Sequence, residues 1–200
     1  MPLEIECKVR VSGHGPVRKA LKRAGAEFVL LFLESNELFD RPEGTLRAAG
    51  SGLRIRSMRP LDAADRGAGA DSRGSGASAE MAPTMTFKGP RRPGAYKIRE
   101  EIEVALDDAA AGRALLESLG YRLMVSFEKR RERWRLSDCT VELDELPTLG
   151  SFVEVEGPGE SAVREVLRAI GLGDASQERR GYVELVAELL GGAAPAVLRF

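Results

Sequence analysis

A strict alternation of charged and apolar side chains is the feature that most constrains how this 200-residue chain can fold. In LEIECKVRV (residues 3–11), every second residue is charged and the residues between are apolar. A β-strand points alternate side chains to opposite faces, so the segment is predicted to be a strand with one charged face. Six further segments repeat the pattern, and they contain LRIR (53–56), TFK (86–88), REEIE (99–103), EKRRERW (128–134), VELDEL (141–146) and FVEVE (152–156).

The charges on these faces are segregated by sign. Carboxylates form i, i+2 pairs in the first and the last two strands, namely Glu4 and Glu6, Glu142 and Asp144, and Glu154 and Glu156. Cations form pairs in between, namely Arg54 and Arg56, and Lys129 and Arg131. Paired carboxylates repel unless a multivalent cation neutralises them, and oxygen ligands without His or Cys favour Mg²⁺ or Mn²⁺. Paired Arg and Lys suit a polyanion, so the two sets together predict a metal–polyphosphate site.

Closure of the strands would bring both sets of charges together. An open sheet would leave the charged face in water, where mixed signs and neutral polar residues are expected instead. A barrel with the charged faces inward would line one water-filled tunnel and leave the apolar faces to pack beneath helices. We therefore predict an α+β fold, a closed eight-stranded antiparallel β-barrel with helices packed outside.

The remaining segments divide into helices, a loop and a tail. Helical spacing of apolar residues predicts helices within residues 17–27, 107–121, 161–172 and 179–190, the second with Asp107 or Asp108 as its N-cap. Residues 59–83 are rich in Gly, Ala and Ser without periodicity, and we expect a flexible loop. Residues 1–190 are predicted to form a single domain, and residues 191–200 a dispensable C-terminal tail.

Composition excludes several classes of function. Thirty Lys and Arg against 31 Asp and Glu give a net charge of −1, so no basic field indicates nucleic acid or an anionic membrane. We expect neither a signal peptide nor a membrane span. Cys7 and Cys139 have no disulfide or zinc spacing and fit the cytoplasm, with Cys7 in the core. The lone His14 is predicted to lie in a solvated loop, so a Ser-His or Cys-His catalytic centre is not expected.

Taken in order, the motifs resemble those of the CYTH superfamily, the triphosphate tunnel metalloenzymes. EIECK (4–8) resembles the E-x-E-x-K signature of that family. The segments NELFD, LRIR, TFKGP, REEIEV, EKRRERW, VELDELPTLGSFVEVEG and GYVELV follow in the family's order, so the resemblance covers residues 3–190. It implies a closed eight-stranded antiparallel tunnel, in agreement with the residue pattern. Leu38 departs from the family, whose members commonly have an aromatic residue there.

The resemblance also implies roles for individual residues. It implies that Mg²⁺ or Mn²⁺ is held by Glu4, Glu6, Asp144, Glu154 and Glu156. It implies a triphosphate cradle of Lys8, Arg54, Arg56, Lys88, Arg131 and Arg180. Catalysis is assigned to Glu4, Glu6, Lys8 and Asp144. From the residues themselves, Arg99 and Lys129 belong to the basic face or pair with Glu101 or Glu103. These two glutamates are expected to be structural partners of internal arginines rather than metal ligands. Trp134 and Phe152 are expected to be packing residues.

The predicted function is that of a metal-dependent enzyme acting on a triphosphate-containing small molecule, such as inorganic triphosphate, ATP or thiamine triphosphate. Hydrolysis of the terminal phosphate is favoured, because we find no motif for an adenine pocket. One alternative is a class IV adenylyl cyclase, which makes cyclic AMP and pyrophosphate from ATP with the same residues. Another is a non-catalytic polyphosphate- or nucleotide-binding module. The full carboxylate set argues against that module, since carboxylates oppose anion binding unless a metal is present.

Overall fold

The computed structural model describes residues 3–61, 81–192 and 195–200, with side chains from Ile5 onward. The strands in these residues are β1 (Leu3–Val11), β2 (Glu27–Asp40), β3 (Gly52–Pro60), β4 (Met81–Lys88), β5 (Lys97–Ala105), β6 (Arg122–Leu136), β7 (Cys139–Leu146), β8 (Gly150–Gly157) and β9 (Ala196–Leu198). The helices are α1 (Gly15–Arg23), α2 (Thr45–Ala48), α3 (Ala109–Ser118), α4 (Glu160–Ala169) and α5 (Tyr182–Leu189). None of the helices in this part of the chain is long and apolar enough to cross a membrane.

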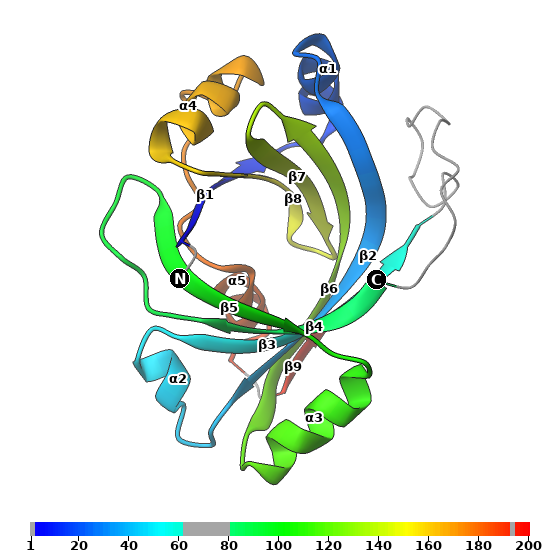
Figure 1. Cartoon of the computed structure of the whole chain (residues 1–200), viewed down its shortest axis with the longest axis vertical. Helices are drawn as coiled ribbons and strands as arrows, with labels where there is room; N and C mark the ends of the chain where they lie inside the picture. The colour runs from blue at the N-terminus through cyan, green and yellow to red at the C-terminus, as the bar shows by residue number, and fades with distance from the viewer. Residues whose placement is uncertain (1–2, 62–80, 193–194) are drawn as a thin grey trace.

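Eight of the strands close into a barrel. Their order is β2-β3-β4-β5-β1-β8-β7-β6, every neighbouring pair is antiparallel, and a further antiparallel pairing of β2 with β6 closes the ring. Figure 1 shows the curved strands surrounding a common interior, with helices outside. The predicted fold class is therefore confirmed.

The main apolar core lies outside the barrel wall, between the strands and two helices. Outward-facing side chains of β1, β7 and β8 pack with α1 and α4, which lie at the top of Figure 1. Leu21 of α1 and Val163 of α4 are fully buried in this core. Cys7 and Trp134 also belong to it, at 2% and 5% exposure, which confirms both predictions. Burial of this apolar face leaves the alternate, charged face of each strand directed inward.

A second core lies at one end of the barrel. Tyr182 and Leu185 of α5 pack with Phe127 and Phe152, and the rings of Phe152 and Tyr182 meet edge to face at 5.4 Å. Phe127 and Phe152 are in phase with the inward-facing charges of β6 and β8, so α5 covers the interior at this end. Phe152 is fully buried, which confirms its expected packing role.

Two further helices, α2 and α3, are fixed by local caps. Asp108 is the N-cap of α3, as predicted, because its carboxylate accepts hydrogen bonds from the amides of Ala110 and Ala111. The short helix α2 was not predicted. It is held by Asp40, whose carboxylate accepts from the backbone N–H groups of Leu46 and Arg47.

Three expectations about irregular segments differ from the structure. β3 runs to Pro60 and β4 starts at Met81, so the predicted loop 59–83 is shorter at both ends, and residues 62–80 lie outside the described part of the chain. The predicted tail contains β9, which pairs in parallel with β6 and buries Ala196 and Leu198. His14 is buried rather than solvated, because it precedes α1 and its Nε2 lies 3.1 Å from the carbonyl oxygen of Phe152.

Candidate active site in the barrel interior

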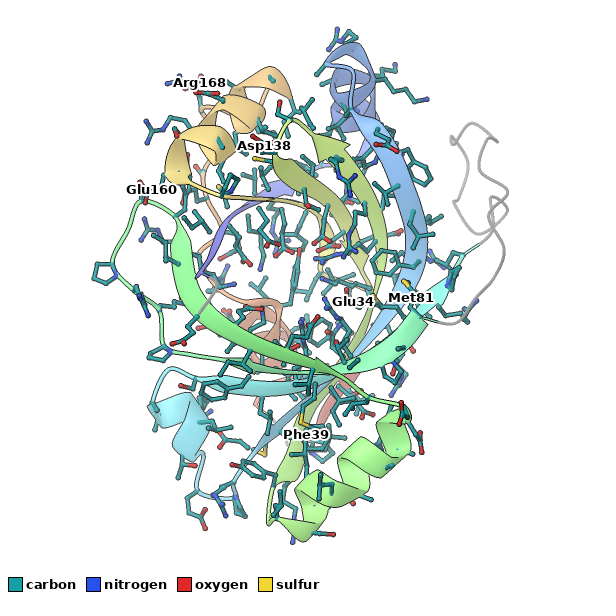
Figure 2. The ribbon with its side chains drawn as sticks, viewed as in Figure 1. Glu34, Phe39, Met81, Asp138, Glu160 and Arg168 are labelled. Carbon is teal, nitrogen blue, oxygen red and sulfur yellow. The ribbon has the colours of Figure 1, made fainter. Side chains whose placement is uncertain are left out.

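The barrel encloses a cavity of about 1340 Å³. All eight strands of the closed ring contribute inward-facing side chains to its lining. Figure 2 shows the side chains inside the barrel, where Glu34 is labelled, whereas Asp138, Glu160 and Arg168 lie outside, near α4. The charged residues of the strands that line the cavity are Glu6, Lys8, Asp40, Arg54, Arg56, Lys88, Lys97, Arg99, Glu101, Glu103, Lys129, Arg131, Arg133, Glu142, Glu154 and Glu156.

The acidic side of the cavity is formed by β1 and β8. Glu6 is the direct cross-strand partner of Glu156, and Lys8 is the partner of Glu154. The carboxylate of Glu6 lies 2.5 Å from Lys97 Nζ, and that of Glu154 lies 3.2 Å from Lys8 Nζ. The structure thus brings three predicted metal ligands, Glu6, Glu154 and Glu156, to one side of the cavity. For Glu4, only its backbone is described, opposite Arg99.

Asp144 occupies a different position from the one expected of a metal ligand. It is fully buried and is not among the residues that line the cavity. Its carboxylate accepts hydrogen bonds from Arg131 Nε at 2.5 Å, from Lys129 Nζ at 3.2 Å and from the hydroxyl of Tyr182 at 2.7 Å. Asp144 therefore fixes the positions of Lys129 and Arg131, two cations that line the cavity.

The donor chemistry of the acidic side fits a hard divalent ion. Glu6, Glu154 and Glu156 offer only carboxylate oxygens, which suits Mg²⁺ or Mn²⁺. Like charges placed directly opposite each other across two strands destabilise a sheet unless a cation offsets them. Within the described residues, however, no three metal-ligating side chains lie close enough together to form a preassembled ion site. The residue types fit the metal, and metal ligation by these residues stays a prediction.

Two arginines supply positive charge to the cavity without a carboxylate partner in the described parts of the chain. Arg54 makes two long contacts, both of 3.5 Å and both to neutral groups, with Asn36 Oδ1 and Thr86 Oγ1. Arg99 has no ion pair there either, and the Nε atoms of both arginines are buried without a hydrogen bond. Desolvated guanidinium groups require an acceptor, so these two arginines can bind an anion that enters the cavity.

The other cations of the predicted cradle are held by carboxylates. Arg56 lies 2.9 Å from Glu103, which confirms that this glutamate is the partner of an internal arginine. Glu101 forms an ion pair with Lys88, a lysine rather than the expected arginine. Arg131 contacts Glu34, Glu142, Asp144 and Glu154. These contacts fix its guanidinium group against the wall of the cavity.

Lys8 connects the cavity to α5. Its side chain is buried, its Nζ donates to the carbonyl oxygen of Arg180 at 3.1 Å, and the same atom lies 3.7 Å from the ring centroid of Tyr182. Burial lowers the pKa of Lys8, and the carboxylates of Glu154 and Glu6 partly oppose that effect.

Arg180 itself is not brought to the cavity. Its half-exposed guanidinium group is bound to Glu178 and Glu188, and the residue is not part of the lining. Only its backbone carbonyl reaches the site, through Lys8. The predicted contact of Arg180 with a triphosphate therefore has no counterpart in this arrangement.

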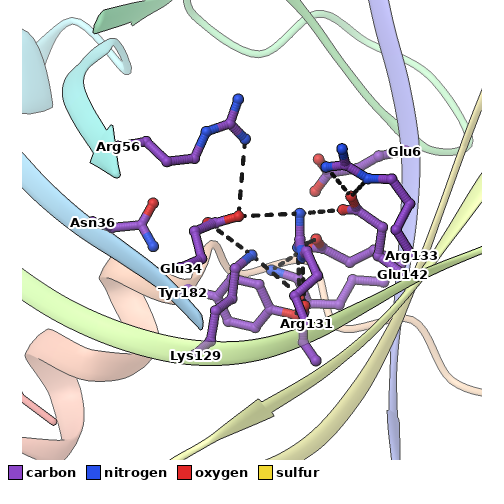
Figure 3. Close-up of polar contacts among 12 residues, drawn as sticks. Glu6, Glu34, Asn36, Arg56, Lys129, Arg131, Arg133, Glu142 and Tyr182 are labelled. Carbon is purple, nitrogen blue, oxygen red and sulfur yellow. Dashed lines mark hydrogen bonds and ion pairs between the residues drawn. The ribbon is translucent and has the colours of Figure 1, made fainter. Parts of the chain in front are cut away.

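Sequence reasoning missed the contribution of β2. Glu34 and Asn36 are both fully buried and point inward, and Figure 3 shows Glu34 between Arg56 on one side and Lys129 and Arg131 on the other. Burial alone would raise the pKa of Glu34, but these cations outweigh it and hold that pKa well below its usual range. The available signal was the i, i+2 spacing of Glu34 and Asn36, which the apolar run before them obscured.

A closed antiparallel barrel with carboxylates on one side of its interior and arginines and lysines around the rest defines a tunnel for an anionic ligand. The profile of the CYTH domain matches residues 2–182, and the chain belongs to the CYTH family. It is similar to a protein from Methanocaldococcus jannaschii that is provisionally named an adenylate cyclase, with 26% identity over 92% of this chain and 98% of the relative. It is also similar to adenylate cyclase CyaB of Aeromonas hydrophila, with 27% identity over 94% of this chain and 90% of the relative.

A solved structure from Hippeastrum has the same fold. It covers 98% of this chain and 99% of its own, with a TM-score of 0.61 and 18% identity. That protein is described as a provisional adenylyl cyclase with a dominant triphosphatase activity.

Proposed function

We propose that this protein binds a triphosphate inside the barrel and hydrolyses its terminal phosphate with the help of Mg²⁺ or Mn²⁺. The observation that carries the proposal is the pair Arg54 and Arg99. Both guanidinium groups belong to the cavity lining, and neither has a carboxylate partner within the described residues. An anionic ligand would satisfy them, and a triphosphate has enough oxygens to contact several cations of the lining at once.

The basic residues have two kinds of role in this proposal. Arg54 and Arg99 bind phosphate oxygens, and Arg56 and Lys88 add further positive charge from the same part of the wall. Arg131, fixed by Asp144, aligns the chain of phosphates and stabilises negative charge that develops as the terminal bond breaks. In the reaction, water adds to the terminal phosphorus, the bridging P–O bond breaks, and orthophosphate separates from the remaining phosphates.

The acidic residues would hold the metal. Glu6, Glu154 and Glu156 face the cavity, and we include Glu4 by its place in the E-x-E-x-K motif. The bound ion would neutralise phosphate oxygens as a Lewis acid. Lys8 lies beside Glu154 and contributes positive charge next to the acidic side. Asp144 acts as a positioning residue in this scheme, through Arg131 and Lys129. We place the protein in the cytoplasm, because Cys7 and Cys139 are free thiols.

Adenylate cyclase activity is the second candidate, because both curated relatives are named adenylate cyclases. In a cyclase the ribose 3′-hydroxyl attacks the α-phosphorus, so the enzyme must also fix the base and ribose. The cavity has the same cations for either reaction. A dominant triphosphatase activity is described for the Hippeastrum protein, which has the same fold, and this supports our preference for hydrolysis.

Phosphate release tests the proposal directly. The protein should release orthophosphate from inorganic triphosphate in Mg²⁺ or Mn²⁺ and should lose this activity in EDTA. Arg54→Ala should reduce the rate, whereas Arg59→Ala, on the same strand but exposed, should not. Triphosphate binding that is retained in EDTA, without phosphate release in either metal, would instead identify a non-catalytic binding module.

A further inference from the structure

Glu34 lies at the seam where the barrel closes. β2 pairs with β3 on one side and with β6 on the other, and the pairing of β2 with β6 closes the ring. Side chains of both β3 and β6 therefore surround Glu34. Its side chain is fully buried. The carboxylate lies 3.3 Å from Lys129 Nζ, 3.7 Å from Arg131 Nη1 and 3.9 Å from Arg56 Nη1, as Figure 3 shows.

These three ion pairs are unusual because none of them is a hydrogen bond. Both oxygens of Glu34 are buried without a hydrogen-bond partner in the described residues. The hydrogen bonds of these cations go to other carboxylates: Arg131 and Lys129 donate to Asp144, and Arg56 donates to Glu103. Glu34 therefore contributes negative charge to the cluster without fixing the geometry of any donor.

Glu34 lies between these cations, fully buried, and is not itself part of the cavity lining. Arg56, Lys129 and Arg131 line the cavity. A ligand in the cavity would meet the three cations directly, while the buried carboxylate between them offsets part of their charge. The low pKa of Glu34 keeps this carboxylate ionised at neutral pH.

We propose that Glu34 sets the affinity of the tunnel for polyanions: its buried charge counteracts Arg56, Lys129 and Arg131 and so weakens the binding of a triphosphate. The inference rests on the proposed function in that its ligand is a triphosphate. Weaker binding of the phosphate groups favours release of the equally anionic products. Glu34 touches no substrate in this scheme and acts only through the three cations.

Removal of this charge should have opposite effects on the free protein and on the complex. In the free protein, the buried Lys129 and Arg131 and the partly buried Arg56 would lose a counter-charge, which destabilises the fold. In the complex, the phosphates would supply the missing negative charge and remove that penalty. Glu34→Gln should therefore lower the melting temperature without ligand and increase the rise in melting temperature that inorganic triphosphate produces.

Calorimetric titration with inorganic triphosphate in EDTA isolates this effect, because neither metal nor turnover contributes. Glu34→Gln should bind at least tenfold more tightly than the wild type. Glu34→Asp keeps the charge and should stay within about threefold of the wild type. Glu37→Gln is the matched control, since Glu37 is on the same strand but pairs with Arg113 of α3, and its affinity should not change.

Asn36→Asp adds a negative charge beside the cations, whereas Glu34→Gln removes one, so it tests the inference in the opposite direction. This test remains valid even if Glu34→Gln does not fold. Asn36 Oδ1 lies 3.5 Å from Arg54, so a new carboxylate there would offset a cation that has no such partner in the described residues. Affinity should fall at least tenfold. Unchanged or weaker binding by Glu34→Gln, or unchanged binding by Asn36→Asp, would overturn the inference. These affinities are measured without phosphate release. If the variants show the expected affinities but the wild type does not hydrolyse triphosphate, the proposed function is contradicted and the inference about Glu34 stands.

Discussion

Glu6 of β1 and Glu156 of β8 are direct partners across two antiparallel strands, and both line the cavity. Glu154 and Glu142 form a second such pair, between β8 and β7. Two pairs of like charges on neighbouring strands cost stability unless cations offset them, and here lysines and arginines do so in part. This acidic side is the part of the tunnel that we assign to the metal.

Glu156→Gln should abolish metal-dependent turnover without unfolding the protein. The substitution removes one carboxylate from the Glu6 pair, so the melting temperature without metal should stay the same or rise. Activity in Mg²⁺ and thermal unfolding monitored by circular dichroism check both parts. Glu145→Gln, at an exposed glutamate of β7, should leave the activity unchanged. Wild-type turnover of a folded Glu156→Gln variant would remove this residue from the metal site.

Arg54→Ala should mainly weaken ligand binding, whereas Arg131→Ala should mainly destabilise the fold. Arg54 has only two long contacts with neutral groups, so its loss should lower kcat/KM by an amount equivalent to about 1.5–3 kcal/mol with little change in the free energy of unfolding. Arg131 neutralises four carboxylates, so its loss should destabilise the fold by about 3–5 kcal/mol. Kinetics and denaturant titration of both variants provide the comparison. Equal destabilisation by the two substitutions would contradict the assignment of Arg54 to ligand binding.

The stability contributed by Glu34 should disappear in acid. Burial raises the pKa of Glu34, but Lys129, Arg131 and Arg56 outweigh it and hold the pKa well below its ordinary value of 4.5. Because the pKa is lower in the folded state, the contribution is fully present above pH 4.5 and is lost as the pH falls through the folded-state pKa. The difference in free energy of unfolding between the wild type and Glu34→Gln should therefore be largest at neutral pH and shrink below pH 4.5. Denaturant titrations across this range test the sign, and a difference that grows in acid would contradict it.

The C-terminal strand should contribute to stability. Leu198 is 7% exposed and packs in the same core as Tyr182 and Leu185 of α5. Leu198→Ala should lower the free energy of unfolding by about 2 kcal/mol, toward the small end of such substitutions because β9 has only three residues. Phe200→Ala, at a side chain that is 48% exposed, should cost less. Equal stability of the wild type and Leu198→Ala would show that the tail is dispensable after all.

The fold could be predicted because one pattern repeats. Alternation of charged and apolar residues in seven segments fixes which face of each strand is polar, and only closure brings these faces together. The strand β9 lacked such a signal, since three residues are too few to show a period. His14 was misjudged because Gly13 and Gly15 beside it suggested a solvated loop, whereas tertiary packing places the side chain against the backbone of Phe152.

The site was only partly predictable, for a physical reason. Spacing along a strand shows that Asp144 and Glu154 face inward, but not how deep each lies or which cation each meets. Asp144 lies behind the lining and binds Arg131, whereas Glu154 reaches the cavity. Glu34 was missed because its strand begins with a mainly apolar run, and its importance depends on cations from two other strands.

Product analysis with inorganic triphosphate and with ATP, each in Mg²⁺ and in Mn²⁺, tests the central claim most directly. Inorganic triphosphate offers the tunnel its phosphates without a base or ribose, so a hydrolase should convert it at least as well as ATP and release orthophosphate. A cyclase needs the base and ribose to bring the 3′-hydroxyl to the α-phosphorus, so it should ignore inorganic triphosphate. We predict orthophosphate from both substrates. Cyclic AMP and pyrophosphate in equal amounts from ATP, with inorganic triphosphate untouched, would contradict the proposed hydrolysis.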